Sequence, residues 1–192
     1  MRLLVILAAV LALAACNKPA QQQTFQGNLP NPANEPQKGV DRSHKGAAAP
    51  VAAFTTPDGT PISLAKFRGV PVLVNLWATW CAPCVKELPT LDKLAASHRV
   101  DGQLGVVAVS QDEGPQASVE AFLKKLNVTD LGAYHDPKSA LSAALGPDTV
   151  LPTTILFDGN GREVWRYVGD LDWTGPDAAK LLAEAGASSK KS

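Results

Sequence analysis

The sequence has few cysteines and no excess of either charge, and both shortages exclude classes of protein. Only three cysteines occur among its 192 residues, at Cys16, Cys81 and Cys84. A small secreted domain stapled by disulfide bonds carries more of them. Covalent haem attachment needs a histidine directly after a Cys-x-x-Cys pair, but Val85 follows Cys84. Lysine plus arginine equals aspartate plus glutamate at 18 each, so nothing predicts a basic surface for nucleic acid.

The apolar run at the N-terminus is too short to cross a membrane. Arg2 precedes an uncharged apolar stretch over residues 3–15, whereas a membrane-spanning helix needs about 20 residues. Its length and its positive flank are typical of a signal peptide. The run ends in LAAC at residues 13–16, which resembles the lipobox of bacterial lipoproteins. The resemblance implies cleavage before Cys16 and attachment of lipid to its thiol; the alternative is an ordinary signal peptide with a chance cysteine.

Composition divides the rest of the chain into a tether, a domain and a tail. Residues 16–50 are rich in Pro, Gln, Asn, Gly and Ala, and have almost no apolar bulk. Such a segment cannot bury enough surface to offset the entropy lost on ordering. We therefore expect a flexible tether over 16–50, behind a lipidated Cys16. One folded domain is expected over 51–186, and a flexible tail over 187–192.

Apolar periodicity within 51–186 predicts alternating helices and strands. Continuous apolar runs predict buried strands at 70–77, 104–109 and 153–157. The sequence DGNG at 158–161 predicts a hairpin turn into an antiparallel strand at 163–168. Shorter strands are expected at 51–56 and 131–135, and helices at 85–98, 115–126, 137–145 and 175–185. This order predicts an α/β fold with a central mixed sheet flanked by helices.

Two cysteines three residues apart lie where a buried strand gives way to a helix. Free backbone N–H groups and the helix dipole favour a thiolate at the helix start, which is the place of Cys81. Cys81 is therefore expected to attack a partner disulfide, and Cys84 to resolve the mixed disulfide. A zinc site would need two more ligands, and the three histidines have no paired spacing, so no metal is expected. A purely structural disulfide is the other alternative, although so small a loop stabilises little.

The run WCAPC at 80–84, after VLVNLWAT at 72–79, resembles the thioredoxin superfamily. Within it, the chain is similar over 51–186 to the membrane-tethered TlpA/ResA group. The resemblance implies a thioredoxin-like three-layer fold with a helix–strand insertion over 110–137. The run LPTT at 151–154 resembles the cis-proline loop, which implies a cis Pro152 facing the dithiol, with the backbone of Leu151 free to pair with a partner. The alternative is a proline that merely starts a strand.

The same resemblance assigns roles to other residues around the dithiol. Trp80, Ala82 and Pro83 are expected to contact substrate together with Leu151 and Pro152.

Two polar positions refine the placement within the superfamily. Asn75 stands where cytoplasmic thioredoxins have a buried aspartate, and Glu87 matches a glutamate of the TlpA/ResA group. Our hypothesis is that Glu87 helps to move the Cys84 proton. The alternative is an exposed carboxylate favoured by the helix dipole.

The resemblance implies an enzyme, a thiol–disulfide oxidoreductase whose only redox group is its own disulfide, without a further cofactor. Pro83 stands where strong oxidants have histidine, which favours a reductant of partner-protein disulfides, for example in cytochrome c maturation. Such a protein needs a membrane electron donor. We expect a monomer on the bilayer through Cys16, facing the periplasm or cell exterior. The alternatives are a metal or haem chaperone that uses the dithiol as ligand, and a thiol peroxidase.

Overall fold

The computed structural model describes residues 37–147 and 149–189. The predicted signal peptide at 1–15, the lipidation site Cys16 and the tether before residue 37 lie outside these residues. Within the described ranges, no helix is long and apolar enough to span a bilayer.

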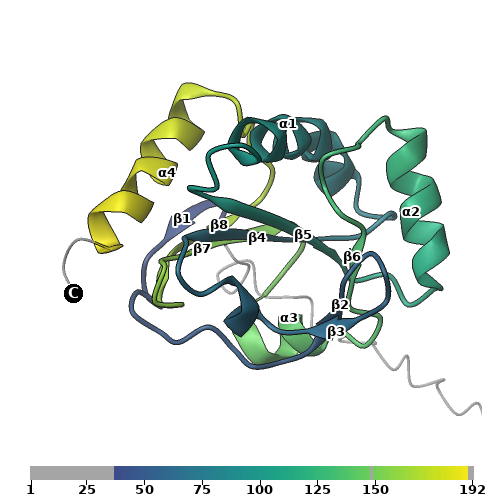
Figure 1. Ribbon diagram of the computed structural model, residues 1–192, viewed down its shortest axis with the longest axis horizontal. Coiled ribbons are helices and arrows are strands. Elements are labelled where there is room, and N and C mark those ends of the chain that lie inside the picture. Colours follow the sequence, from purple (N-terminus) through teal and green to yellow (C-terminus); the bar gives the residue numbers. More distant parts are fainter. Residues whose placement is uncertain (1–36, 148, 190–192) are drawn as a thin grey trace, which may run out of the picture. The chain divides into compact units, whose positions relative to one another are not determined.

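A single mixed sheet holds the eight strands found in the described residues (Figure 1). Its order is β1-β8-β7-β4-β5-β6-β2-β3. The pairs β4–β5 and β5–β6 are parallel, and the other neighbours are antiparallel. The strands are β1 (Gly39–Asp41), β2 (Phe54–Thr55), β3 (Pro61–Ile62), β4 (Val72–Trp77), β5 (Gly105–Ser110), β6 (Tyr134–His135), β7 (Thr153–Phe157) and β8 (Glu163–Val168).

The central strands β4, β5 and β7 are the three that the apolar runs predicted. Every residue of β4 and β7 is buried, as expected for strands covered on both faces. The crossover helix α1 (Ala82–His98) allows β5 to lie parallel to β4. In this register Asn75 of β4 lies opposite Thr154 of β7, which places a polar pair in the middle of an apolar sheet.

Helices cover both faces of the sheet and form the predicted three layers. Besides α1 they are α2 (Gln116–Lys125), α3 (Ala140–Leu145), α4 (Pro176–Ser189) and the short 3-10 helix η2 (Leu64–Phe67). Figure 1 shows α1 and α4 on one face and α3 on the other. The core on the α1 side joins Leu88 and Leu91 to Trp165, and the opposite core is closed by Leu141 and Leu145 of α3. The α/β architecture with a mixed sheet is thus confirmed.

The predicted tether over 16–50 is wrong for its last residues. Residues 39–41 form β1 on the outer edge of β8, and Gly46 and Ala47 exchange backbone hydrogen bonds with Glu163 of β8 (2.7 and 2.9 Å). The tether was predicted from amino-acid composition, which reports only how much side-chain surface a segment can bury. This segment is instead held by hydrogen bonds to backbone groups at the edge of the sheet. The predicted tail is likewise wrong at 187–189, because α4 continues to Ser189.

The short strands expected at 51–56 and 131–135 exist but are reduced to two residues each, in β2 and β6. The helix α2 and the strand β6 occupy the stretch where the insertion was expected.

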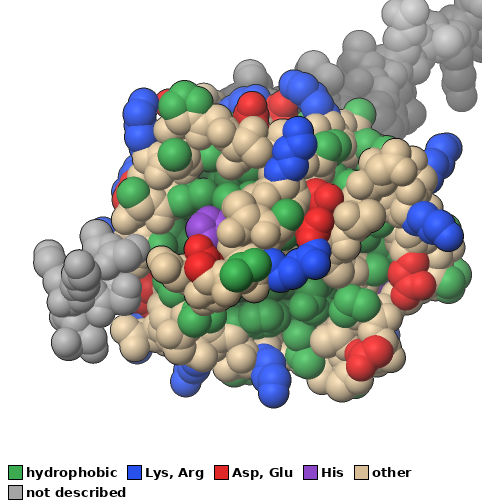
Figure 2. Space-filling view, turned by 45° about the horizontal axis from the view of Figure 1, so that its top comes forward, with side chains coloured by type: hydrophobic (Ala, Val, Ile, Leu, Met, Phe, Trp, Pro, Cys, Tyr) green, Lys and Arg blue, Asp and Glu red, His purple; other side chains and the backbone are tan. Residues whose placement is uncertain are grey.

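Charges of both signs are interspersed on the face of the molecule that Figure 2 displays. This distribution agrees with the equal numbers of basic and acidic residues in the sequence.

Candidate functional site

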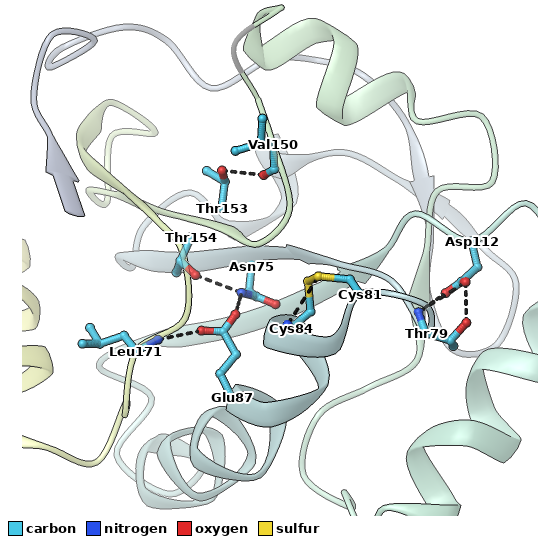
Figure 3. Close-up of a disulfide and its surroundings, with 10 residues drawn as sticks. All are labelled: Asn75, Thr79, Cys81, Cys84, Glu87, Asp112, Val150, Thr153, Thr154 and Leu171. Atoms are coloured by element: carbon cyan, nitrogen blue, oxygen red, sulfur yellow. Dashed lines mark hydrogen bonds between the residues drawn. A yellow bond between two sulfur atoms is a disulfide. The ribbon is translucent and has the colours of Figure 1, made fainter. Parts of the chain in front are cut away.

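A disulfide bond joins Cys81 and Cys84 at the start of α1 (Figure 3). Cys81 is the N-cap residue of α1, and its Sγ accepts a hydrogen bond from the backbone N–H of Cys84 at 3.3 Å. Pro83 stands in the first turn of the helix, where its missing N–H donor is not needed. The helix start therefore offers both a hydrogen-bond donor and a favourable dipole to negative charge on Cys81 Sγ.

The two sulfur-bearing residues differ in their access to solvent. Cys84 is completely buried, whereas Cys81 keeps 6% of its surface exposed. A partner can therefore reach Cys81 and not Cys84, which matches the predicted division into an attacking and a resolving cysteine. Trp80, next to Cys81, is 71% exposed. It offers an apolar surface beside the dithiol instead of burying it.

The predicted cis-proline loop lies at the same edge of the sheet as the dithiol. The Leu151–Pro152 peptide bond is cis, as the resemblance implies. Because β7 runs antiparallel to β4 with Thr153 opposite Leu76, Pro152 lies beside the strand end that leads into Trp80 and Cys81.

A cleft of about 600 Å³ opens between these segments. Trp80 and Leu151 line it together with residues that the sequence did not single out, which are Gln111, Asp112, Glu113, Ser139 and Ser142. Most of these follow β5 or β6, so the parallel order of β4, β5 and β6 brings their carboxyl ends to one edge. That rule, applied to the predicted strand at 104–109, could have found residues 111–113.

Asp112 connects the loop after β5 to the loop that carries the dithiol. Its carboxylate accepts hydrogen bonds from the backbone N–H (3.0 Å) and the hydroxyl (2.6 Å) of Thr79 (Figure 3). It also accepts one from the hydroxyl of Ser110 (2.7 Å). Thr79 lies two residues before Cys81, so Asp112 holds the backbone segment that leads from β4 to this cysteine.

Glu87 is buried behind the dithiol, with 2% of its surface exposed. Its carboxylate accepts hydrogen bonds from Asn75 Nδ2 (2.8 Å), Trp173 Nε1 (3.0 Å) and the backbone N–H of Leu171 (3.2 Å). Burial raises the pKa of Glu87 from 4.5 to about 7, and the hydrogen bonds keep it from rising further. The alternative of an exposed helix carboxylate is therefore wrong. A buried carboxyl group that titrates near neutrality is suited to proton transfer.

Within residues 37–147 and 149–189, no three histidine, cysteine or acidic side chains lie close enough together to hold a metal ion. His135 is buried, and its Nε2 lies 2.7 Å from the backbone oxygen of Asp112. That contact gives it a structural role in the loop after β5.

Comparisons with known proteins agree with this geometry. The Redoxin family matches residues 44–182. The chain is 35% identical over 118 residues to the thiol-disulfide oxidoreductase ResA of Geobacillus kaustophilus, covering 61% of this chain and 65% of the relative. It is 30% identical over 126 residues to a ResA of Bacillus cereus, covering 65% of this chain and 70% of the relative. The match thus spans about two thirds of the length of these relatives.

Solved structures show the same fold. A putative thiol:disulfide interchange protein DsbE from Chlorobium tepidum matches with a TM-score of 0.64 and 26% identity, over 73% of this chain and 96% of that one. A putative thioredoxin from Neisseria meningitidis matches with a TM-score of 0.60 and 28% identity, over 75% of this chain and 91% of that one. The thioredoxin-like fold predicted from the sequence is thereby confirmed.

Proposed function

Because this chain belongs to the redoxin family, as a ResA/TlpA-like member of the thioredoxin superfamily, we propose that it is a thiol–disulfide oxidoreductase acting on partner proteins. One observation carries the proposal: a disulfide at a helix start whose outer cysteine is accessible and whose inner cysteine is buried. The names of its relatives agree with this activity.

The exchange runs in two displacement steps. In the reduced chain the Cys81 thiolate attacks one sulfur of the partner disulfide, so a new S–S bond forms and one partner thiolate leaves. Cys84 then loses its proton and attacks Cys81 Sγ, which releases the second partner thiolate. Two electrons pass to the partner, and the chain is left with the Cys81–Cys84 disulfide. Glu87 is the proposed acceptor of the Cys84 proton, since it is the buried carboxylate one helical turn further along α1.

The cleft beside Cys81 is the proposed seat of the partner. Trp80 and Leu151 give it apolar surface, and the backbone of Leu151 can pair with an extended partner segment, as the cis-proline loop of the superfamily implies. Ala82 and Pro83 line the outer side of the helix start, where they are exposed. The partner's disulfide would thereby be held in line with Cys81 Sγ.

The direction we propose is reduction of the partner. Pro83 stands before Cys84 where strong oxidants of the superfamily have a histidine. A reductant on the outer side of the membrane needs a membrane electron donor, which would return the disulfide to the dithiol. Assembly of c-type cytochromes, in which cysteines must be kept reduced, is the process we propose for it.

Trapping the mixed disulfide tests the proposed function. In a Cys16→Ser background, Cys84→Ser should accumulate a covalent adduct with a disulfide-bonded peptide such as oxidised insulin, because the second displacement is blocked. Cys81→Ser is the matched control and should form none. Adducts of equal yield in both variants would contradict the assigned order of attack. Turnover of peroxide without any thiol partner would favour the peroxidase alternative instead.

The proposed location has its own test. We propose that lipid on Cys16 holds the protein on the membrane, facing the periplasm or cell exterior, since a multiply acylated cysteine anchors stably. Cys16→Ser should move the protein from the membrane fraction to the soluble extracytoplasmic fraction. Retention of the variant on membranes would overturn the anchor.

A further inference from the structure

The side chain of Asn75, in the middle of β4, has an unsatisfied oxygen. It is completely buried, and its Nδ2 group donates to Glu87 Oε1 at 2.8 Å and to Thr154 Oγ1 at 2.9 Å. Its Oδ1 atom is buried and has no hydrogen-bond partner among the described residues. Buried polar atoms are nearly always paired, so this acceptor calls for a physical reason.

The oxygen of Asn75 lies on the side of the dithiol. Asn75 lies between Leu73 and Trp77 on the same face of β4, the face that packs against α1. Cys84 and Glu87 are three residues apart on α1 and therefore share one face of the helix. The amide nitrogen turns to Glu87 and Thr154, so the oxygen points away from both, and Figure 3 shows it directed toward Cys84.

The orientation of this amide is fixed by its partners. An ionised carboxylate can only accept hydrogen bonds, so the ionised Glu87 must face the nitrogen of Asn75 and not its oxygen. Thr154 lies opposite Asn75 in the register of β4 and β7 and receives the second amide hydrogen. The fold thus directs Asn75 Oδ1 toward Cys84, and this oxygen has no hydrogen-bond donor within the described part of the chain while Cys84 is in the disulfide.

We propose that Asn75 is a positioning residue for Cys84, whose Sγ–H donates to Asn75 Oδ1 once the disulfide is reduced. Reduction by an external dithiol breaks the Cys81–Cys84 bond and adds two electrons and two protons, while the external dithiol becomes a disulfide. The new proton on Cys84 Sγ supplies the missing donor. This inference rests on the proposed function, because it assigns a residue that favours the dithiol over the disulfide.

The consequence is a shift in the redox equilibrium. A buried acceptor is unpaired in the disulfide form and paired in the dithiol form, so Asn75 favours reduction. Replacing it by leucine, which has similar volume and no polar atom, removes this difference. Loss of the hydrogen bonds to Glu87 and Thr154 affects both redox forms alike and largely cancels.

Equilibration of the full chain with glutathione at pH 8, where Glu87 is ionised, tests the proposal. Asn75→Leu should lower the equilibrium constant for reduction by about fivefold or more, and Asn75→Ala should act in the same direction if leucine does not fold. Thr154→Val is the matched control: it removes a partner of the nitrogen and leaves the oxygen, so it should change the constant by less than about twofold. An unchanged constant in the Asn75 variants, or an equal shift in Thr154→Val, would overturn the proposal.

A spectroscopic measurement reads the proposed hydrogen bond without any need for activity. In a Cys16→Ser, Cys81→Ser chain, Cys84 carries the only thiol. Its infrared S–H stretching band should lie below that of a thiol without an acceptor, and Asn75→Leu should move it up. A band already at the position of an unbonded thiol would sink the inference. A lowered band in a chain whose parent cannot exchange disulfides would instead refute the proposed function alone.

Discussion

Two opposing effects determine the pKa of Glu87. Burial disfavours its charged form, and three hydrogen-bond donors favour that form. Burial is the larger effect, because the pKa is raised to about 7 in spite of the donors. The carboxyl group consequently changes charge near neutral pH, as the proposed transfer of the Cys84 proton requires.

Stability should depend on pH through Glu87. Its pKa in the folded protein exceeds the unfolded value of 4.5, so its contribution to stability is complete below pH 4.5 and is lost as pH rises through about 7. The loss amounts to about 3 kcal/mol. Glu87→Gln should flatten the pH dependence of the free energy of unfolding by this amount between pH 4.5 and 8, measured by urea denaturation of the oxidised protein.

Comparing the pH dependence of the free energy of unfolding in wild type and Glu87→Gln separates the effect of Glu87 from that of the other acidic residues. The pKa of Asp170 is lowered to about 2 by hydrogen bonds from Lys38 and Lys86, so it titrates below this window. Equal slopes in wild type and variant would refute the raised pKa. The same variant should also lose the pH dependence of dithiol exchange near neutrality if Glu87 takes the Cys84 proton.

The sequence identified Glu87 as a candidate site residue, but it could not predict that this side chain is buried with a raised pKa. Its donors come from Asn75, Leu171 and Trp173, and the last two are more than eighty residues away along the chain. Only the packing of the segment before α4 against α1 brings them together. The cysteines were easier to place, because a strand end, a helix start and a Cys-x-x-Cys spacing are all local features.

At the scale of elements, β1 protects an edge of the sheet. It pairs three residues with β8, with Asp41 opposite Arg166. In the following segment Gly46 and Ala49 donate backbone hydrogen bonds to the β8 hairpin, and Ala47 accepts one from it. The buried ion pair of Arg166 and Glu163 (2.8 Å) lies on that same strand. Without β1, the edge of β8 would be open to pairing with another chain.

Truncation measures the contribution of β1. A chain that begins at residue 51 should be less stable than one that begins at residue 37 by about 3 kcal/mol, since at least three backbone hydrogen bonds worth about 1 kcal/mol each are lost. Urea denaturation of the two chains, both carrying Cys81 and Cys84, provides the comparison. Equal stabilities would mean that the segment 37–50 does not belong to the fold.

The strands that were not predicted from the sequence, or were predicted with the wrong length, are the short ones. The buried strands β4, β5 and β7 are five or six residues long and mostly apolar, and such segments can be recognised without knowledge of their neighbours. By contrast, β1, β2 and β3 have two or three residues each. Their existence depends on a partner edge being available, and no periodicity within so few residues reveals that.

At the scale of the whole molecule, the sheet order determines where the site lies. The loops after β4 and β5, the segment after β6 and the loop before β7 all reach the same edge, and the cleft forms between them. The face of the molecule shown in Figure 2 carries charges of both signs. Recognition of a partner is therefore expected to depend on the cleft and on Trp80 more than on long-range attraction between charged surfaces.

The reduction potential of the Cys81–Cys84 couple tests the central claim most directly. Equilibration of the protein with thiol buffers, followed by quantification of both redox forms, should give a reversible two-electron couple. Its potential should lie nearer to the thioredoxin value of about −270 mV than to the DsbA value of about −120 mV. A potential at the DsbA end would reverse the proposed direction, and failure to form a reversible couple would contradict thiol–disulfide exchange altogether.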